Sequence, residues 1–147
     1  MYAKTTGDPI DPSEFQEIQD LIENGVSLIT FFGHGSINGF DQNLEQVSDW
    51  DNQGKYPFLI ANSCYTGNIY EPGQTSQSEE FILIPNEGVV GYCASTKLGF
   101  SSYLNLLCGR LYENFSTAYY HYPFAYSLMK AKSSLQNQGY LADGYDI

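Results

Sequence analysis

Three short apolar runs, with a single charged residue among them, set the strongest limit on the fold of this chain. They lie at 26–32, 56–62 and 87–96 and are rich in β-branched and aromatic residues, which predicts three strands. The first run is typical of a strand buried on both faces. Capping signals or helical spacing of apolar residues predict helices at 11–25, 99–115 and 123–139, and a short helix that starts near Ser78 and is ended by Pro85. This alternation predicts an α/β fold with a mostly parallel sheet, in one domain spanning residues 1–147.

Small, polar and reactive residues follow each predicted strand at its carboxyl end. His34 lies between two glycines in "FFGHGS", Cys64 follows the second run in "IANSCYTG", and Ser95 and Thr96 end the third. In open α/β sheets, ligands bind at the carboxyl ends of the strands. We therefore expect a functional site at this edge of the sheet.

Cys64 and His34 together suggest acyl transfer. An imidazole that takes up the thiol proton turns cysteine into a strong nucleophile. The N–H groups of Gly35 and Cys64 could stabilise the oxyanion that forms on a scissile carbonyl. Each residue alone also fits a structural role, since free cysteine is often buried and a histidine in a tight turn can bond to backbone. Their position on consecutive strand ends favours the catalytic interpretation.

The remaining candidates are expected to be structural. Cys93 lies in the third predicted strand and Cys108 on an apolar helix face, while His121 follows no strand and could line a substrate site. Asp41 could orient His34 or hold a structural calcium ion, although a solvated turn fits its spacing better. Three cysteines without a CxxC pair do not suggest zinc or a disulfide framework. We expect no metal site and no cofactor.

Charge and hydropathy exclude several classes of partner. Six Lys and Arg against 17 Asp and Glu give a net charge of −11, which disfavours nucleic acid and anionic membrane surfaces. No apolar stretch is long enough to span a bilayer, and the first 15 residues lack the apolar core of a signal peptide. The chain is therefore expected to be cytosolic or part of a longer exported precursor.

Four segments in order, "FFGHGS", "IANSCYTG", "SEEFILIPNEGVVGYCAST" and "FSSYLNLLCGRLYENF", give the chain a resemblance to the gingipain family of cysteine peptidases. Within that family the pattern is most similar to the surface peptidase of the bacterial type IX secretion system. The resemblance covers residues 13 to about 135. It implies a caspase-like, three-layer α/β/α fold, a polypeptide substrate and no cofactor. It also implies a secreted or cell-surface location as part of a larger precursor, in the processing of secreted or surface proteins.

The resemblance also assigns roles by position. His34 matches the general base and Cys64 the nucleophile, with Gly35 and Cys64 as oxyanion donors. Ser95 and Thr96 match the segment that walls the S1 pocket. The sequence departs from caspases themselves, because their QAC-x-G pattern is here "NSCYTG".

The chain opens about one helix before the histidine-bearing strand, whereas domains of the family begin with further strands. We therefore expect a partial domain whose first strand has an uncovered apolar edge, or one covered by other parts of a larger chain or by secretion components. An inactive peptidase-like binding module is the main alternative to an endopeptidase. A transpeptidase that uses the same residues is a third hypothesis.

Overall fold

A parallel sheet forms the centre of the molecule. The computed structural model describes residues 12–41, 44 and 47–139. The strands β1 (Leu28–Phe32), β4 (Phe58–Asn62) and β5 (Gly91–Ala94) pair in the order β1-β4-β5, and both pairings are parallel. The three predicted strands therefore form one sheet with β4 in the middle.

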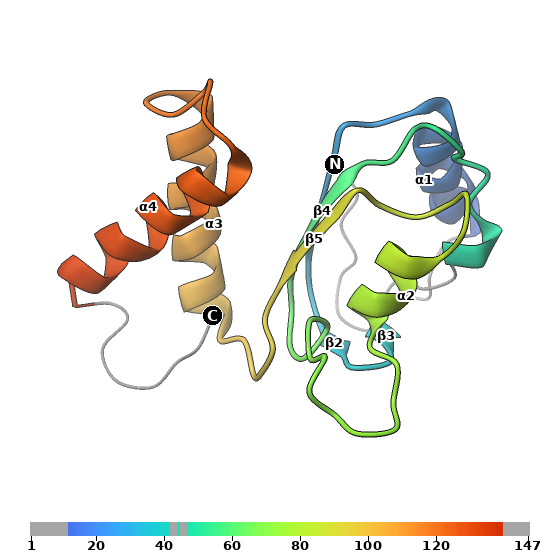
Figure 1. Cartoon of the computed structure of the whole chain (residues 1–147), viewed down its shortest axis with the longest axis horizontal. Helices are drawn as coiled ribbons and strands as arrows, with labels where there is room; N and C mark the ends of the chain where they lie inside the picture. The colour runs from blue at the N-terminus through green and yellow to red at the C-terminus, as the bar shows by residue number, and fades with distance from the viewer. Residues whose placement is uncertain (1–11, 42–43, 45–46, 140–147) are drawn as a thin grey trace.

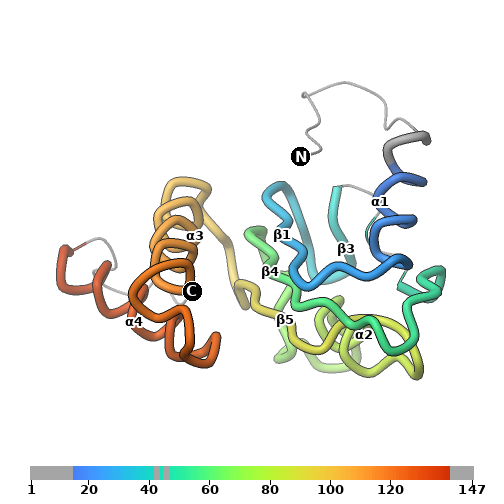
Figure 2. Tube along the Cα trace, turned by 90° about the horizontal axis from the view of Figure 1, so that it is seen from above, coloured from blue at the N-terminus to red at the C-terminus, as the bar shows by residue number. Residues whose placement is uncertain are grey.

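Helices cover both faces of this sheet (Figure 1). The first helical layer holds α1 (Pro12–Asn24), α2 (Gln77–Leu83) and the short 3-10 turn η1 (Val47–Asp49). The second layer is a helical pair, α3 (Ser101–Ser116) and α4 (Phe124–Asn137). Seen from above, the sheet lies between the two layers (Figure 2). The arrangement confirms the predicted α/β fold with three layers.

Alternation along the strands creates two separate cores. In β4, Leu59 and Ala61 pack against the layer of α1 and α2, while Ile60 packs against α3 and α4. The first core is the larger, and its other buried members are Ile22, Phe31, Phe40, Leu44, Val47, Trp50, Phe81 and Val89. The second consists of Ile60, Leu107, Leu111, Ala131 and Leu135. The middle strand thus joins both layers, because successive side chains point to opposite faces.

The prediction that the first strand is buried on both faces is wrong. Only Phe31 of β1 is buried, and Phe32 is 51% exposed. In the described part of the chain β1 lies at an edge of the sheet, where only β4 pairs with it. An uncharged run cannot by itself distinguish an edge strand from a central one. The expectation that further chain covers this edge stays a prediction.

Element boundaries also differ from the predictions. The third strand covers Gly91–Ala94 rather than 87–96, while α2 ends at Leu83, in agreement with the predicted stop at Pro85. Gly88 has a φ of +88°, which belongs to a turn and not to either element. The sequence also gave no sign of the small antiparallel hairpin of β2 (Gly35–Ser36) and β3 (Gly39–Phe40).

Candidate active site

Strand register brings His34 and Cys64 to equivalent positions on neighbouring strands. The last paired residues of β1 and β4 are Phe32 and Asn62, and the Gly33 N–H donates to the Asn62 carbonyl at 3.3 Å. Each candidate follows its strand by two residues. Since neighbouring strands lie about 4.8 Å apart, the two segments leave the sheet side by side.

Gly35 brings the histidine segment into contact with the cysteine segment. A Cβ atom at position 35 would lie 2.8 Å from the Thr66 methyl carbon and 2.9 Å from both Cβ and Oγ of Ser63. No such atom fits, so only glycine allows this approach of backbone to side chain. The residue after His34 therefore rests on the residues that flank Cys64.

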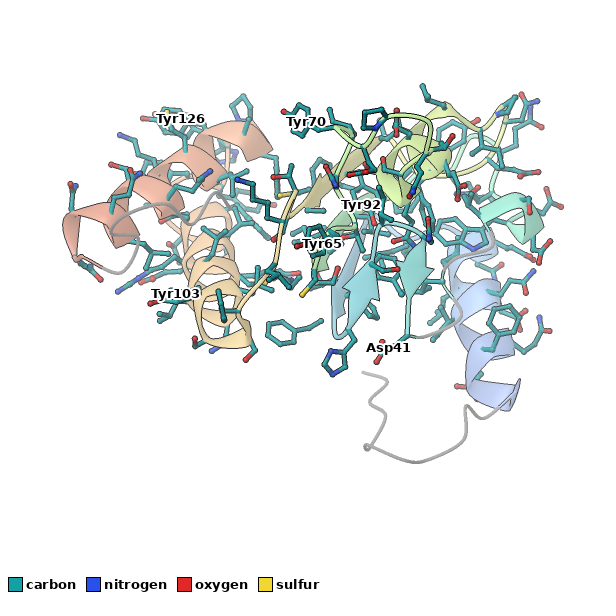
Figure 3. All side chains as sticks on the ribbon, turned by 90° about the horizontal axis from the view of Figure 1, so that it is seen from below. Asp41, Tyr65, Tyr70, Tyr92, Tyr103 and Tyr126 are labelled. Carbon is teal, nitrogen blue, oxygen red and sulfur yellow. The ribbon has the colours of Figure 1, made fainter. Side chains whose placement is uncertain are left out.

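Backbone hydrogen bonds hold the loop that carries Cys64 against the segment after β5. The N–H of Tyr65 donates to the Lys97 carbonyl at 3.0 Å, and that of Gly67 donates to the Ser95 carbonyl at 3.0 Å. Tyr65 has a φ of +58°, a left-handed conformation that is uncommon for a tyrosine. Figure 3, which looks at the strand ends, labels Tyr65 at the centre of the molecule.

The thiol of Cys64 contacts backbone rather than imidazole. Its sulfur accepts from the Gly99 N–H at 3.4 Å and the thiol donates to the Gly99 carbonyl at 3.6 Å. The imidazole of His34 is exposed, and no hydrogen bond joins it to Cys64 in the part of the chain that the structure describes. The structure thus brings the two segments together without bringing the two side chains into hydrogen-bond contact.

The candidate oxyanion donors lie in these same segments. Within the described ranges, no backbone carbonyl accepts from the Cys64 N–H. Gly35 belongs to β2, and the His34 carbonyl before it accepts from the Asp41 N–H at 3.0 Å. The hairpin therefore fixes the backbone around Gly35, next to the cysteine loop.

Ser95 and Thr96 differ in their surroundings. Ser95 is only 2% exposed, and its Oγ has no hydrogen-bond partner among the described residues. It lines a cavity of about 100 Å³ between the sheet and the pair α3 and α4. Thr96 is half-buried in the following bend. Of the two predicted pocket residues, Thr96 has the more accessible side chain.

The comparison with known families identifies the family of the chain. A model of peptidase family C25 matches residues 2–146, almost the whole chain. The chain belongs to peptidase family C25. A comparison with curated proteins found no match, and neither did a comparison with solved structures.

Family C25 is the gingipain family, so the predicted family is confirmed. At the level of the family, the chain is a cysteine-peptidase hydrolase with a polypeptide substrate. No helix in the described ranges has the length and apolarity that a membrane span requires.

The other two cysteines of this C25 chain line the cavity that Ser95 also lines. Burial raises the pKa of the Cys93 thiol, an effect that the charge of Lys132 opposes. Burial also raises the pKa of Cys108. The hydrogen bond that the Asn62 amide donates to its sulfur at 3.4 Å acts in the opposite direction and lowers this pKa in part. Raised thiol pKa values fit structural rather than nucleophilic cysteines.

Among the described residues, neither of the other predicted candidates, His121 and Asp41, forms a hydrogen bond with the Cys64 thiol. His121 is exposed in the turn between α3 and α4, where its ring contacts Tyr120 with centroids 4.9 Å apart. Asp41 follows β3, beside Gly33 (Figure 3). Among the described residues, no group of three or more His, Cys, Asp or Glu side chains could hold a metal ion.

Sequence reasoning missed the residues that support the cysteine loop. Ser63 and Thr66 are buried on both sides of Cys64, and Gly99 contacts its sulfur. The only local signal was the run of small polar residues around the cysteine. Gly99 could not have been found, because it approaches the loop from 35 residues away.

Proposed function

We propose that this C25 chain is a cysteine endopeptidase that acts through Cys64 as nucleophile and His34 as general base. The observation that carries the proposal is the register of β1 and β4, which puts both residues two positions beyond paired strand ends. The contact of Gly35 with Ser63 and Thr66 supports it, since it joins the two segments.

In the proposed reaction, the imidazole of His34 takes the thiol proton and the Cys64 sulfur attacks the peptide carbonyl. The backbone N–H groups of Gly35 and Cys64 stabilise the oxyanion. The tetrahedral intermediate collapses as His34 protonates the leaving amine, which leaves an acyl-enzyme. Water, deprotonated by the same imidazole, then releases the acid product and regenerates the thiol.

The contact between Cys64 and Gly99 defines a resting position of the thiol in this proposal. The sulfur has to turn from the Gly99 backbone toward His34 before attack. Catalytic hydrogen bonds often form only when substrate binds, so an open resting geometry is compatible with activity. Thr96, together with the backbone at Ser95, would line the pocket for the residue before the scissile bond.

The proposed setting is the processing of secreted or surface proteins, as in type IX secretion. The enzyme would act at the cell surface as part of a larger precursor and would need no cofactor. Its partners would be a polypeptide substrate and other parts of a longer chain or of the secretion apparatus. A structural calcium ion near Asp41 would affect stability rather than the chemical steps.

A second candidate function is a peptidase-like module that binds peptide without cleaving it. The observation that favours it is the Cys64 thiol, which is bonded to Gly99 and not to His34. Among the described residues, no carboxylate bonds to the imidazole of His34 to orient it.

Alkylation and turnover separate these functions. We would measure iodoacetamide labelling of each cysteine by peptide mapping from about pH 5 to about pH 9, together with cleavage of a mixed-sequence fluorogenic peptide library. If the chain is an endopeptidase, iodoacetamide should modify Cys64 faster than Cys93 and Cys108, and Cys64→Ala should abolish cleavage. His34→Ala should slow both reactions.

Matched variants control this experiment. The chain has two histidines, so His121→Ala removes an exposed imidazole away from the site. Cys93→Ala removes a thiol in the cavity between the sheet and the pair α3 and α4. Both should retain activity. Full cleavage by Cys64→Ala would refute the endopeptidase, and peptide binding without cleavage or selective labelling would establish the binding module.

A further inference from the structure

We propose that two hydrogen-bonded side-chain pairs, Ser63 with Thr66 and Tyr92 with Gln77, position the cysteine and histidine segments relative to each other. None of the four side chains forms a hydrogen bond with the thiol within the described residues, so they act as positioning residues. The inference rests on the proposed peptidase function and deepens it. We call these four residues the hydroxyl chain.

The first link joins the residues on both sides of Cys64. Ser63 Oγ and Thr66 Oγ1 are 2.9 Å apart in a hydrogen bond that bridges Cys64 and Tyr65. Both side chains are buried, with exposed fractions of 1% and 0%. The same two side chains support Gly35, so one bonded pair contacts the segments of both proposed catalytic residues.

The second link joins the sheet to α2. Tyr92 of β5 donates its phenolic hydrogen to Gln77 Oε1 at 3.2 Å. Burial raises the pKa of Tyr92 well above its ordinary value, and the Thr66 side chain opposes this shift only in part. The Gln77 Nε2 is buried and has no hydrogen-bond partner among the described residues.

The third link returns to the histidine hairpin. The Gln77 N–H donates to the carbonyl of Ile37 at 3.0 Å, in the turn between β2 and β3. The N–H of Ser78 donates to the Thr66 carbonyl at 3.2 Å. The start of α2 is thus bonded to the hairpin that follows His34 and to the loop that follows Cys64.

The hydroxyl chain therefore connects the two segments by two routes. One route is the direct contact of Gly35 with Ser63 and Thr66. The other runs from the Thr66 carbonyl to the start of α2, and from the Gln77 N–H to the hairpin turn. Buried hydrogen bonds of this kind hold a geometry firmly, because an unpaired polar group is costly in a low dielectric. Displacement of a catalytic group by about 1 Å can cost about a hundredfold in rate.

Thr66→Val tests the inference with least change in shape. It keeps the methyl group that lies against Gly35 and removes the hydroxyl that bonds to Ser63. We expect kcat to fall about tenfold, with KM changed less than about twofold, because orientation and not binding is affected. The pH profile of Cys64 alkylation should shift toward that of His34→Ala. Thr66→Ser, which keeps the hydroxyl, should restore the wild-type profile, and Tyr92→Phe should show a weaker form of the Thr66→Val effect.

Matched variants exclude a merely structural role. Ser127 on α4 is as buried as Ser63, but its Oγ has no partner in the described part of the chain, so Ser127→Ala is the control for Ser63→Ala. Tyr126 on α4 lies away from Tyr65 and Tyr92 (Figure 3), so Tyr126→Phe is the control for Tyr92→Phe. Both controls should leave the pH profile unchanged. Melting temperatures of all variants are measured alongside.

The outcomes separate this inference from the proposed function. Suppose that labelling of Cys64 in the wild type depends on His34, and that Thr66→Val has the pH profile and kcat of the wild type. The hydroxyl chain then does not position the site. If Thr66→Val only lowers the melting temperature, the role is structural and the inference is also wrong. If wild-type Cys64 labels no faster than Cys108, the proposed function fails first.

Discussion

At the scale of single residues, the site depends on backbone approach at one glycine. Two neighbouring side chains, Ser63 and Thr66, fill the space where a Cβ at Gly35 would lie. A methyl group there would push the histidine segment away from the cysteine loop. Gly35 thus sets the spacing between the proposed base and nucleophile.

We expect Gly35→Ala to lower the free energy of unfolding by about 1–3 kcal/mol, because the added methyl group overpacks the contact. We also expect it to reduce peptidase activity by more than about tenfold, because the histidine segment is displaced from the cysteine loop. Thermal denaturation and the cleavage assay would measure the two effects. Gly109→Ala is the control, since no atom lies within 4 Å of its missing Cβ and it is helical. That variant should be neutral or stabilising. Equal losses in both variants would contradict this role of Gly35.

At the scale of elements, the start of α2 matters because it bonds to both site segments. Its N-cap is Ser76, whose Oγ accepts from the Glu79 N–H at 3.3 Å, while Glu79 accepts from the Ser76 N–H at 2.8 Å. This capping box fixes the first turn, and with it Gln77. The short helix has no other capping side chain at this end within the described residues.

Ser76→Ala should destabilise the protein by about 1 kcal/mol through loss of the cap. Chemical denaturation would measure the change, and Ser102→Ala, in the exposed first turn of α3, is the control. A loss in Ser102→Ala as large as that in Ser76→Ala would show that the cap is not responsible.

The same box predicts a pH dependence. Hydrogen bonds from the Ser76 backbone and side chain lower the pKa of Glu79 below its ordinary value of 4.5. Since the folded pKa is depressed, the stabilisation is complete above about pH 5 and is lost as the pH falls through the folded pKa. Wild type should therefore melt above Glu79→Gln near neutral pH, and the difference should shrink toward about pH 3. A difference that is constant with pH would contradict the prediction.

At the scale of the whole molecule, β4 contributes side chains to both cores. Leu59 packs against α1 and α2, and Ile60 packs against α3 and α4. Loss of packing on one face therefore weakens the strand on which the other face depends. We expect the two layers to unfold together.

Phe81→Ala in the first core and Leu111→Ala in the second should test this coupling. Each removes a side chain that is at most 1% exposed and should cost about 3–5 and about 2–5 kcal/mol, respectively. Calorimetry should show one transition in both variants, at a lower temperature than in wild type. Two transitions in either variant would show that the layers unfold independently.

Local pattern was enough to determine the α/β fold and to place the candidate site at one edge of the sheet. Strand and helix periodicities are properties of neighbouring residues, and parallel strands necessarily end on the same side. Hence His34 and Cys64 could be placed on strand ends from the sequence alone. Family membership, too, was visible in four short segments.

Only the tertiary structure decided which groups surround these residues. The order of the strands puts β1 at a sheet edge. Gly99 contacts the Cys64 sulfur, and Tyr92 bonds to Gln77. All of these arrangements involve residues that are distant in sequence. Side-chain identity does not encode such partners, because they follow from how elements pack. The sequence therefore determined what chemistry is present, and the packing determined how it is held.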